Sequence, residues 1–185
     1  MRNLLGALAI VAAGPALATG LDIEVAGEAS GVIHIDLFED VAPQHVAQIT
    51  RLAEEGAYDG VVFHRVIDGF MAQTGDVRFG DSSDSAFDMR RAGTGGSEEP
   101  DLKAEFSDRP FDRGTVGMAR ASDPDSANSQ FFIMFAPAGH LNGQYTVVGE
   151  VTEGMDVVDA IKRGTGRNGA VEGEPDRMVK VTVTE

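Results

Sequence analysis

Alternating hydrophobic and polar residues predict a chain built mostly from β-strands. In residues 32–37, Ile33 and Ile35 share one face while His34 and Asp36 share the other. This period of two is typical of a half-buried strand. Similar short hydrophobic runs predict further strands at 21–25, 61–66, 115–119, 130–135, 146–151 and 179–184.

Helical spacing is confined to two short stretches. In the first, Pro43 suits an opening helical turn, Val46 and Ile49 follow on one face, and Gly56 ends the run. The second predicted helix covers 155–163. About eight strands and two short helices predict a mainly β domain, a closed eight-stranded antiparallel barrel capped by the helices, because closure removes exposed strand edges.

Composition supports one domain and excludes several partners. A chain of 185 residues with 42% hydrophobic residues is long enough to bury one sizeable core. The 23 glycines favour a turn-rich β protein. A net charge of -15 argues against nucleic acid and anionic membranes as partners. The absence of cysteine excludes disulfides, a thiol nucleophile and a zinc thiolate site.

The first 18 residues have the pattern of an export signal. Arg2 precedes an apolar run at 4–13, and the small residues 16–18 form a cleavage site. The run is shorter than the ~20 apolar residues that span a bilayer. Cleavage after Ala18 would release a mature domain, residues 19–185, into the periplasm or outside the cell. The alternatives are a frayed N-terminal strand and an uncleaved anchor.

Common catalytic and cofactor motifs are missing or out of context. No G-x-S-x-G motif is present, and the four histidines do not form a metal-binding pattern. Residues 164–169 match G-x-G-x-x-G but follow a predicted helix and do not open one, so we interpret them as a turn. In the 93–97 run, an anion nest is disfavoured by the adjacent Glu98 and Glu99. We therefore expect no metal and no cofactor.

The segment FHRVIDGFMAQTGD, residues 63–76, carries a candidate binding site. It places a cation, Arg65, near the apolar side chains of Phe70 and Met71 and the amide of Gln73. An apolar pocket beside a fixed charge suits a hydrophobic substrate with a polarisable amide. Taken one residue at a time, the plainer interpretation is a β core with solvated arginines.

Five sequence blocks carry a resemblance to a known protein family: FHRVIDGFMAQTGD, GTGGS, GMAR, ANSQFFI and HLNGQYTVVGEVTEGMDVVDAI. Their order and spacing make the resemblance specific. Together they resemble the cyclophilins, which are peptidyl-prolyl isomerases, along almost the whole mature chain, and bacterial exported members most of all. The resemblance implies an eight-stranded barrel with a substrate groove on its outer face. It also implies a catalytic arginine at Arg65 and substrate-binding positions at Phe70, Met71, Gln73, Ala119, Gln130, Phe132 and Leu141. Residues 93–96 match a loop beside a neighbouring side-chain pocket.

Three further binding positions depart from the pattern of eukaryotic members. His140 stands where tryptophan is frequent, Tyr145 where histidine is frequent and Arg120 where asparagine is frequent. The last two resemble bacterial relatives. Because His140 replaces a large aromatic donor at the pocket rim, the resemblance implies only weak cyclosporin binding.

The implied activity is rotation about Xaa-Pro bonds in unfolded or flexible polypeptides, which assists protein folding. Such rotation faces a barrier of about 20 kcal/mol, and ~7 kcal/mol of preferential binding to the twisted amide would accelerate it by about five powers of ten. Arg65 would donate to the prolyl nitrogen in that state. We expect a monomer without nucleic-acid partners. The alternative is a proline-peptide-binding chaperone or scaffold with little turnover; a hydrolase ranks far lower.

Overall fold

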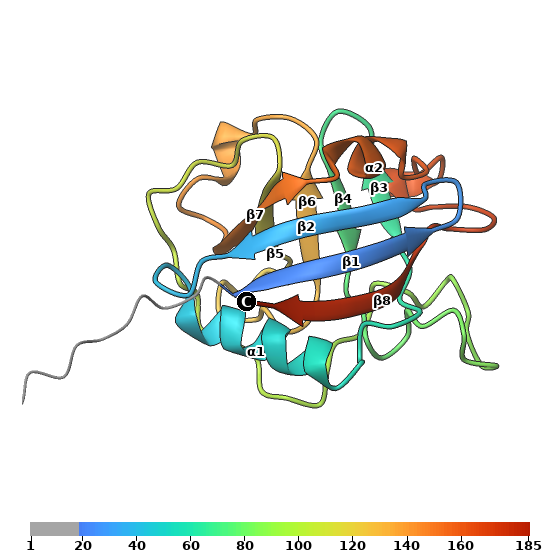
Figure 1. The fold of residues 1–185 in the computed structure, drawn as a ribbon, viewed down its shortest axis with the longest axis horizontal. Coiled ribbons are helices and arrows are strands. Elements are labelled where there is room, and N and C mark those ends of the chain that lie inside the picture. The colour runs from blue at the N-terminus through green and yellow to red at the C-terminus, as the bar shows by residue number, and fades with distance from the viewer. Residues whose placement is uncertain (1–18) are drawn as a thin grey trace, which may run out of the picture.

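The framework of the molecule is one curled sheet of eight antiparallel strands (Figure 1). The computed structural model describes residues 19–185, so the predicted export signal at 1–18 lies outside the described residues. The strands are β1 Gly20–Ala26, β2 Gly31–Leu37, β3 Arg65–Ile67, β4 Met71–Thr74, β5 Thr115–Met118, β6 Phe131–Met134, β7 Val147–Glu153 and β8 Arg177–Thr184. The prediction of a mainly β chain with eight antiparallel strands is confirmed.

The sheet is a half-barrel, and the prediction that it closes completely is wrong. Its strand order is β3-β4-β6-β5-β7-β2-β1-β8, which leaves β3 and β8 as edges. Near the seam, the Val62–Arg177 bridge joins the approach to β3 to the start of β8. The residues before β3 contact the β8 side through separate bonds, such as Phe63 N to Asp176 O at 2.9 Å. A regular ladder therefore does not form across the seam.

Strand β4 was not predicted, because both of its faces are buried. Met71 packs into one hydrophobic cluster and Ala72 into another, so the segment shows no hydrophobic alternation. The strand predicted at 61–66 is also displaced, since the ladder begins only at Arg65. A turn at Gly69, with a φ of 67°, joins β3 and β4 into a hairpin.

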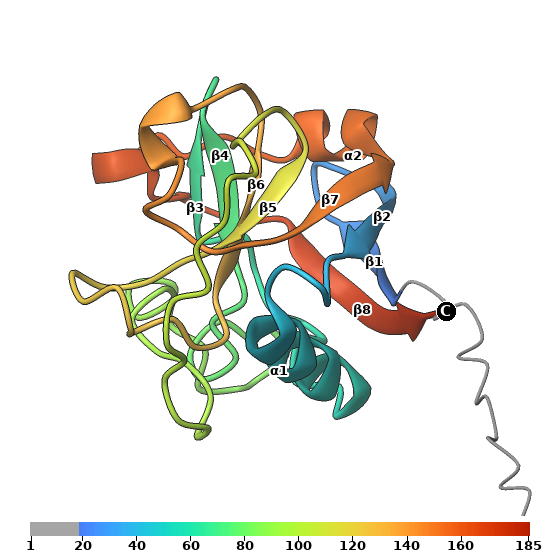
Figure 2. The same cartoon turned by 90° about the vertical axis from the view of Figure 1, so that its left-hand side faces the viewer.

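Two α-helices close opposite ends of the curled sheet (Figures 1 and 2). Helix α1, Pro43–Glu54, packs near β8, and helix α2, Met155–Ala160, packs near β2. Helix α2 is shorter than the predicted 155–163, because Ile161 has an extended ψ of 130°. Within residues 19–185, two 3₁₀ turns, η1 Gly139–Leu141 and η2 Arg167–Gly169, complete the regular structure.

The N-terminus of α1 is stabilised by a residue from a distant loop. No side chain of the helix caps its first turn. Instead, the Glu105 carboxylate accepts the backbone N–H of Gln44 at 3.1 Å and that of His45 at 3.2 Å. It also contacts Nδ1 of the fully buried His45 ring at 2.7 Å. The long polar loop before β5 is therefore attached to the helix.

In the described part of the chain, buried hydrophobic residues form two clusters, one on each side of β4, β5 and β6. The larger lies inside the half-barrel, between the sheet and the helices, and contains Phe63, Ala72, Phe131 and Ile133. The smaller lies on the outer face and consists of Phe38, Met71, Phe111, Phe132, Met134, Ala138, Leu141 and Val147. This outer cluster is the floor on which a site can be built.

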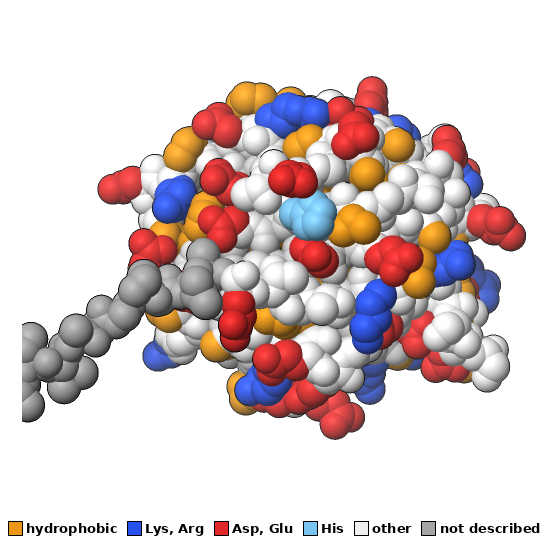
Figure 3. All heavy atoms as spheres, viewed as in Figure 1, with side chains coloured by type: hydrophobic (Ala, Val, Ile, Leu, Met, Phe, Trp, Pro, Cys, Tyr) orange, Lys and Arg blue, Asp and Glu red, His pale blue; other side chains and the backbone are white. Residues whose placement is uncertain are grey.

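The surface reflects the acidic composition. Acidic side chains are spread over the face shown in Figure 3, with fewer basic side chains between them. Within residues 19–185, no helix has the length and apolar character that crossing a membrane requires.

Candidate active site

Sheet register brings residues from four strands into one row on the outer face. Arg65 of β3 pairs with Gln73 of β4, Gln73 pairs with Phe132 of β6, and Phe132 pairs with Gly117 of β5. Directly opposed residues project to the same face of an antiparallel sheet. The row therefore runs from a cation through an amide to an aromatic ring.

A groove of about 370 Å³ lies over this row. Ten of the eleven predicted site residues line it: Arg65, Phe70, Met71, Gln73, Ala119, Arg120, Phe132, His140, Leu141 and Tyr145. The eleventh, Gln130, lines an adjoining pocket of about 420 Å³ that shares Gln73, Ala119 and Arg120 with the groove. The structure thus brings all of these residues together, while their individual roles stay predictions.

Aromatic rings make the deep apolar end of the groove. Phe132 stacks on Phe111 at 5.7 Å between ring centroids and meets Tyr145 edge-on at 5.9 Å. Gly117 makes this packing possible, because a Cβ there would lie 2.5 Å from the Phe111 ring and 2.7 Å from the Phe132 ring. Neither Phe111 nor Gly117 was predicted as a site residue.

The rim of the groove comes from η1 and the β3–β4 hairpin. His140 is exposed and stacks on Phe70, with ring centroids 5.9 Å apart and planes inclined by 26°. Leu141, the next residue, is buried and turns into the outer cluster. The imidazole therefore covers the hairpin side of the rim, and the leucine closes the floor below it.

Arg65 is held in place from two sides. Its Nε donates to the Asn168 carbonyl at 3.0 Å, and its Nη1 donates to Gln73 Oε1 at 3.1 Å. Burial lowers the pKa of this half-buried guanidinium, and the nearby Tyr145 opposes that shift. An arginine remains charged at neutral pH even so. The Arg65 side chain is therefore a fixed cation at the edge of the groove.

The turn that holds Arg65 is the segment whose letters match G-x-G-x-x-G. Asn168 has a φ of 57°, in the left-handed region that asparagine tolerates better than most residues. Ala170 forms a bridge to Arg65 itself. The segment is a turn, as predicted, but sequence reasoning missed its contact with Arg65, because the two lie about a hundred positions apart.

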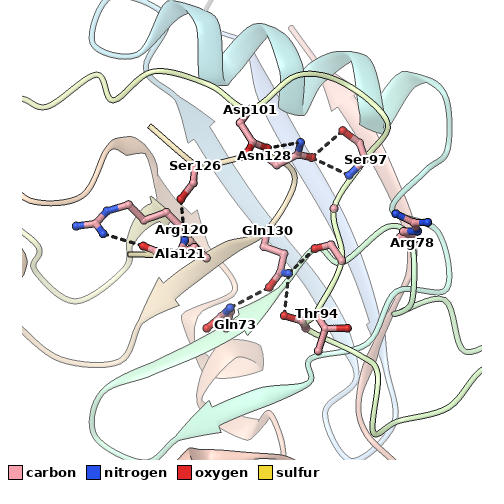
Figure 4. A pocket seen from close by; sticks show the side chains of 14 residues that line it. Gln73, Arg78, Thr94, Ser97, Asp101, Arg120, Ala121, Ser126, Asn128 and Gln130 are labelled. Atoms are coloured by element: carbon pink, nitrogen blue, oxygen red, sulfur yellow. Dashed lines mark hydrogen bonds between the residues drawn. The ribbon is translucent and has the colours of Figure 1, made fainter. Parts of the chain in front are cut away.

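Two glutamine amides continue the hydrogen bonding away from Arg65 (Figure 4). Gln73 Nε2 donates to Gln130 Oε1 at 2.9 Å, and Gln130 Nε2 donates to the carbonyls of Gly95 at 2.7 Å and Gly93 at 3.2 Å. A guanidinium only donates and a carbonyl only accepts, so both amides are held in one orientation. This chain of bonds forms the wall between the groove and the adjoining pocket.

The segment after β5 lines both the groove and the adjoining pocket. Ala119 N donates to Gln130 O at 2.9 Å, which joins this segment to the start of β6. The Arg120 guanidinium lies 4.4 Å from the centre of the Tyr145 ring and donates to the Gln144 carbonyl at 2.9 Å. Arg120 is therefore packed along the wall of the groove. Gln144, which was not predicted as a site residue, also lines the groove.

A glycine-rich segment, residues 93–97, also lines the adjoining pocket and is held by Asn128. Asn128 Oδ1 accepts the backbone N–H and the hydroxyl of Ser97, both at 2.7 Å (Figure 4). Within residues 19–185, no cluster of three or more His, Cys, Asp or Glu side chains is arranged to bind a metal ion. What these side chains provide is hydrogen bonding, a cation and apolar surface.

On the outer face of the half-barrel, the groove combines an aromatic floor with a fixed guanidinium at its edge. The family model for "Cyclophilin type peptidyl-prolyl cis-trans isomerase/CLD" matches residues 21–184. A relative from Brucella suis, named a probable peptidyl-prolyl cis-trans isomerase, is 62% identical over 154 residues, covering 83% of this chain and 78% of the relative. This chain belongs to the cyclophilin-type peptidyl-prolyl cis-trans isomerases.

Solved structures agree with the fold. The cyclophilin AquaCyp293 from Hirschia baltica has a TM-score of 0.69 and 25% identity, covering 88% of this chain and 73% of its own. A Cryptosporidium parvum cyclophilin, whose structure was determined in the presence of the dipeptide Ala-Pro, has a TM-score of 0.73 and 23% identity, covering 90% of this chain and 99% of its own. The half-barrel with two helices is thus the cyclophilin fold.

Proposed function

We propose that this isomerase binds the proline ring of its substrate in the aromatic groove and uses Arg65 as its catalytic residue. The observation that carries the proposal is the row Arg65, Gln73 and Phe132, which places a fixed cation beside an apolar floor. The proline ring would rest on Phe132, between Met71 and Leu141. The presence of Ala-Pro with the Cryptosporidium relative supports this choice of ligand.

The chemistry requires only a preference for the twisted amide. When the Xaa-Pro bond rotates out of plane, its nitrogen regains a lone pair that can accept a hydrogen bond. Arg65 would donate to that lone pair, and the planar ground state cannot accept the same bond. Gln73 and the Ala119 backbone would hold the preceding residues, so that rotation is confined to the other side of the bond.

Exchange spectroscopy on a short Ala-Pro peptide tests this assignment. We expect Arg65→Ala to lower kcat/KM for isomerisation by about 10²–10³-fold, the usual cost of removing one donor to transition-state charge. Arg90→Ala is the matched control, since Arg90 is largely exposed and pairs with Asp88. Equal acceleration by wild type and Arg65→Ala would refute the catalytic role.

Binding measurements on the same variants separate catalysis from a scaffold. The alternative of a proline-peptide chaperone predicts that the protein holds the peptide at wild-type affinity without accelerating exchange. Phe132→Ala should weaken binding and turnover together, because it removes the apolar floor. Wild-type affinity in that variant would contradict the position proposed for the ring.

We further propose that the protein is exported by the segment 1–18 and assists folding in the periplasm or outside the cell. Its substrates would be unfolded or flexible polypeptides that contain proline, and it would act as a monomer. Weak cyclosporin binding is expected, because the rim carries the imidazole of His140. Mass spectrometry of the N-terminus tests export: a mature protein beginning at Thr19 supports it, and an intact Met1 refutes cleavage after Ala18.

A further inference from the structure

A carboxylate that is fully buried lies behind the pocket wall. Asp76 has no exposed surface. Its Oδ1 accepts the backbone N–H groups of Arg78 at 3.1 Å and Phe79 at 3.0 Å, and its Oδ2 accepts those of Gly93 at 2.8 Å and Gly95 at 2.9 Å. No lysine or arginine within residues 19–185 forms an ion pair with it. Four N–H donors therefore stabilise the buried charge.

The glycine segment that Asp76 binds is the same one that receives the bonds of Gln130. The amides of Gly93 and Gly95 point to Asp76, and their carbonyls accept from Gln130 Nε2. Gly93 has a φ of 90°, and a Cβ on Gly95 would lie 2.8 Å from Asp76 Oδ1. Glycine is thus required at both positions for the backbone to approach the carboxylate.

These bonds form one unbroken series between a buried anion and the proposed catalytic cation. From Asp76 it passes through the backbone of Gly93 and Gly95, the amide of Gln130, the amide of Gln73 and then to Arg65 Nη1. We call this series the relay. Each amide in it is held at both ends, so a displacement of the glycine segment moves the acceptor that orients the guanidinium.

We propose that Asp76 is a positioning residue for catalysis, which acts through the relay to fix the guanidinium of Arg65 beside the substrate. The inference rests on the proposed role of Arg65. If Asp76 only stabilised the fold, its effect on the isomerisation rate would not depend on Gln73. A positioning residue must lose its influence on the rate once the relay is cut elsewhere.

Asp76→Asn tests the proposal in the full chain. Asparagine has one acceptor oxygen, so its NH₂ group would face one pair of N–H donors and release that pair. In the wild-type background we expect Asp76→Asn to lower kcat/KM for the Ala-Pro peptide about tenfold. In the Gln73→Ala background, where the relay is already broken, the same change should lower kcat/KM less than about twofold relative to Gln73→Ala alone. An equal loss in both backgrounds would overturn the proposal.

Another buried aspartate, Asp176, supplies a matched control. Asp176 is 1% exposed and accepts the backbone N–H groups of Ala29 at 2.8 Å and Lys162 at 2.6 Å, outside the relay. Asp176→Asn should lower the melting temperature but keep kcat/KM within about twofold at a temperature where the protein is folded. A loss as large as that of Asp76→Asn would assign both effects to stability and overturn the proposal.

Gln130→Glu provides a second test if Asp76→Asn does not fold. The new carboxylate oxygen would face the Gly93 and Gly95 carbonyls and repel them, while the other oxygen still accepts from Gln73. Wild-type kcat/KM in this variant would refute the relay. Full isomerase activity in Arg65→Ala would refute the proposed function. If Arg65→Ala loses activity but the effects of Asp76→Asn and Gln73→Ala on kcat/KM are independent, only the role of Asp76 is refuted.

Discussion

Acid should destabilise this protein through His64, a neutral histidine beside the active site. Its side chain is 6% exposed, and neither ring nitrogen has a hydrogen-bond partner within residues 19–185. The ring lies against Gly93, where a Cβ would come within 2.5 Å of it. Burial is the main reason that the pKa of His64 is lowered from 6.5 to about 4; the Asp76 carboxylate opposes the shift and Arg65 adds to it.

The sign and size of the effect follow from proton binding. Between pH 6.5 and pH 4 the unfolded chain binds a proton at His64 and the folded chain does not, so stability falls as the pH falls through this window. One pKa unit corresponds to about 1.4 kcal/mol, so the full effect is ~3 kcal/mol and the part lost between pH 7 and pH 5 is about 2 kcal/mol. His64→Gln removes this dependence, because glutamine does not titrate.

Urea unfolding at pH 7 and pH 5 measures the prediction. The wild type should lose about 2 kcal/mol more free energy of unfolding over this interval than His64→Gln does. Comparing the two variants cancels the contribution of the carboxylates, which titrate in both. Parallel pH dependence in wild type and His64→Gln would refute the reasoning.

Two substitutions test the packing of the site and of helix α1. Gly117→Ala places a Cβ 2.5 Å from the Phe111 ring and 2.7 Å from the Phe132 ring, so the floor of the groove should shift. We therefore expect KM for an Ala-Pro peptide to rise several-fold. An unchanged KM would contradict the proposed floor. Glu105→Ala removes the acceptor of two N–H groups at the start of α1 and should cost ~1–2 kcal/mol of stability, measured by thermal unfolding against the control Glu98→Ala. Identical melting temperatures in these two variants would show that Glu105 does not stabilise the helix.

Much of the candidate site could be predicted because its residues lie in short contiguous blocks. Arg65, Met71 and Gln73 fall within one segment, residues 63–76, which could be selected as a block although strand β4 itself was not predicted. Gln130, just before β6, and Phe132, its second residue, likewise fall within one short block. Local spacing and family resemblance are sufficient to select such residues, whereas their roles await the measurements above.

The residues that were missed act through contacts between distant segments. Asn168 supports Arg65 from a turn that looks ordinary in the sequence. Gly117 matters only because two aromatic rings from other segments approach it. Asp76 was visible as the last residue of the segment 63–76, but its four N–H partners come from two loops that fold back onto it.

By itself, the sequence determined the mainly β character, the approximate positions of most strands and the blocks that build the groove, because hydrophobic periodicity and motif spacing are local properties. Only the tertiary structure decided that the sheet remains open between β3 and β8, since closure depends on pairing between segments far apart in the chain. It also decided the orientation of the two glutamine amides, because that orientation requires a guanidinium at one end of the relay and backbone carbonyls at the other.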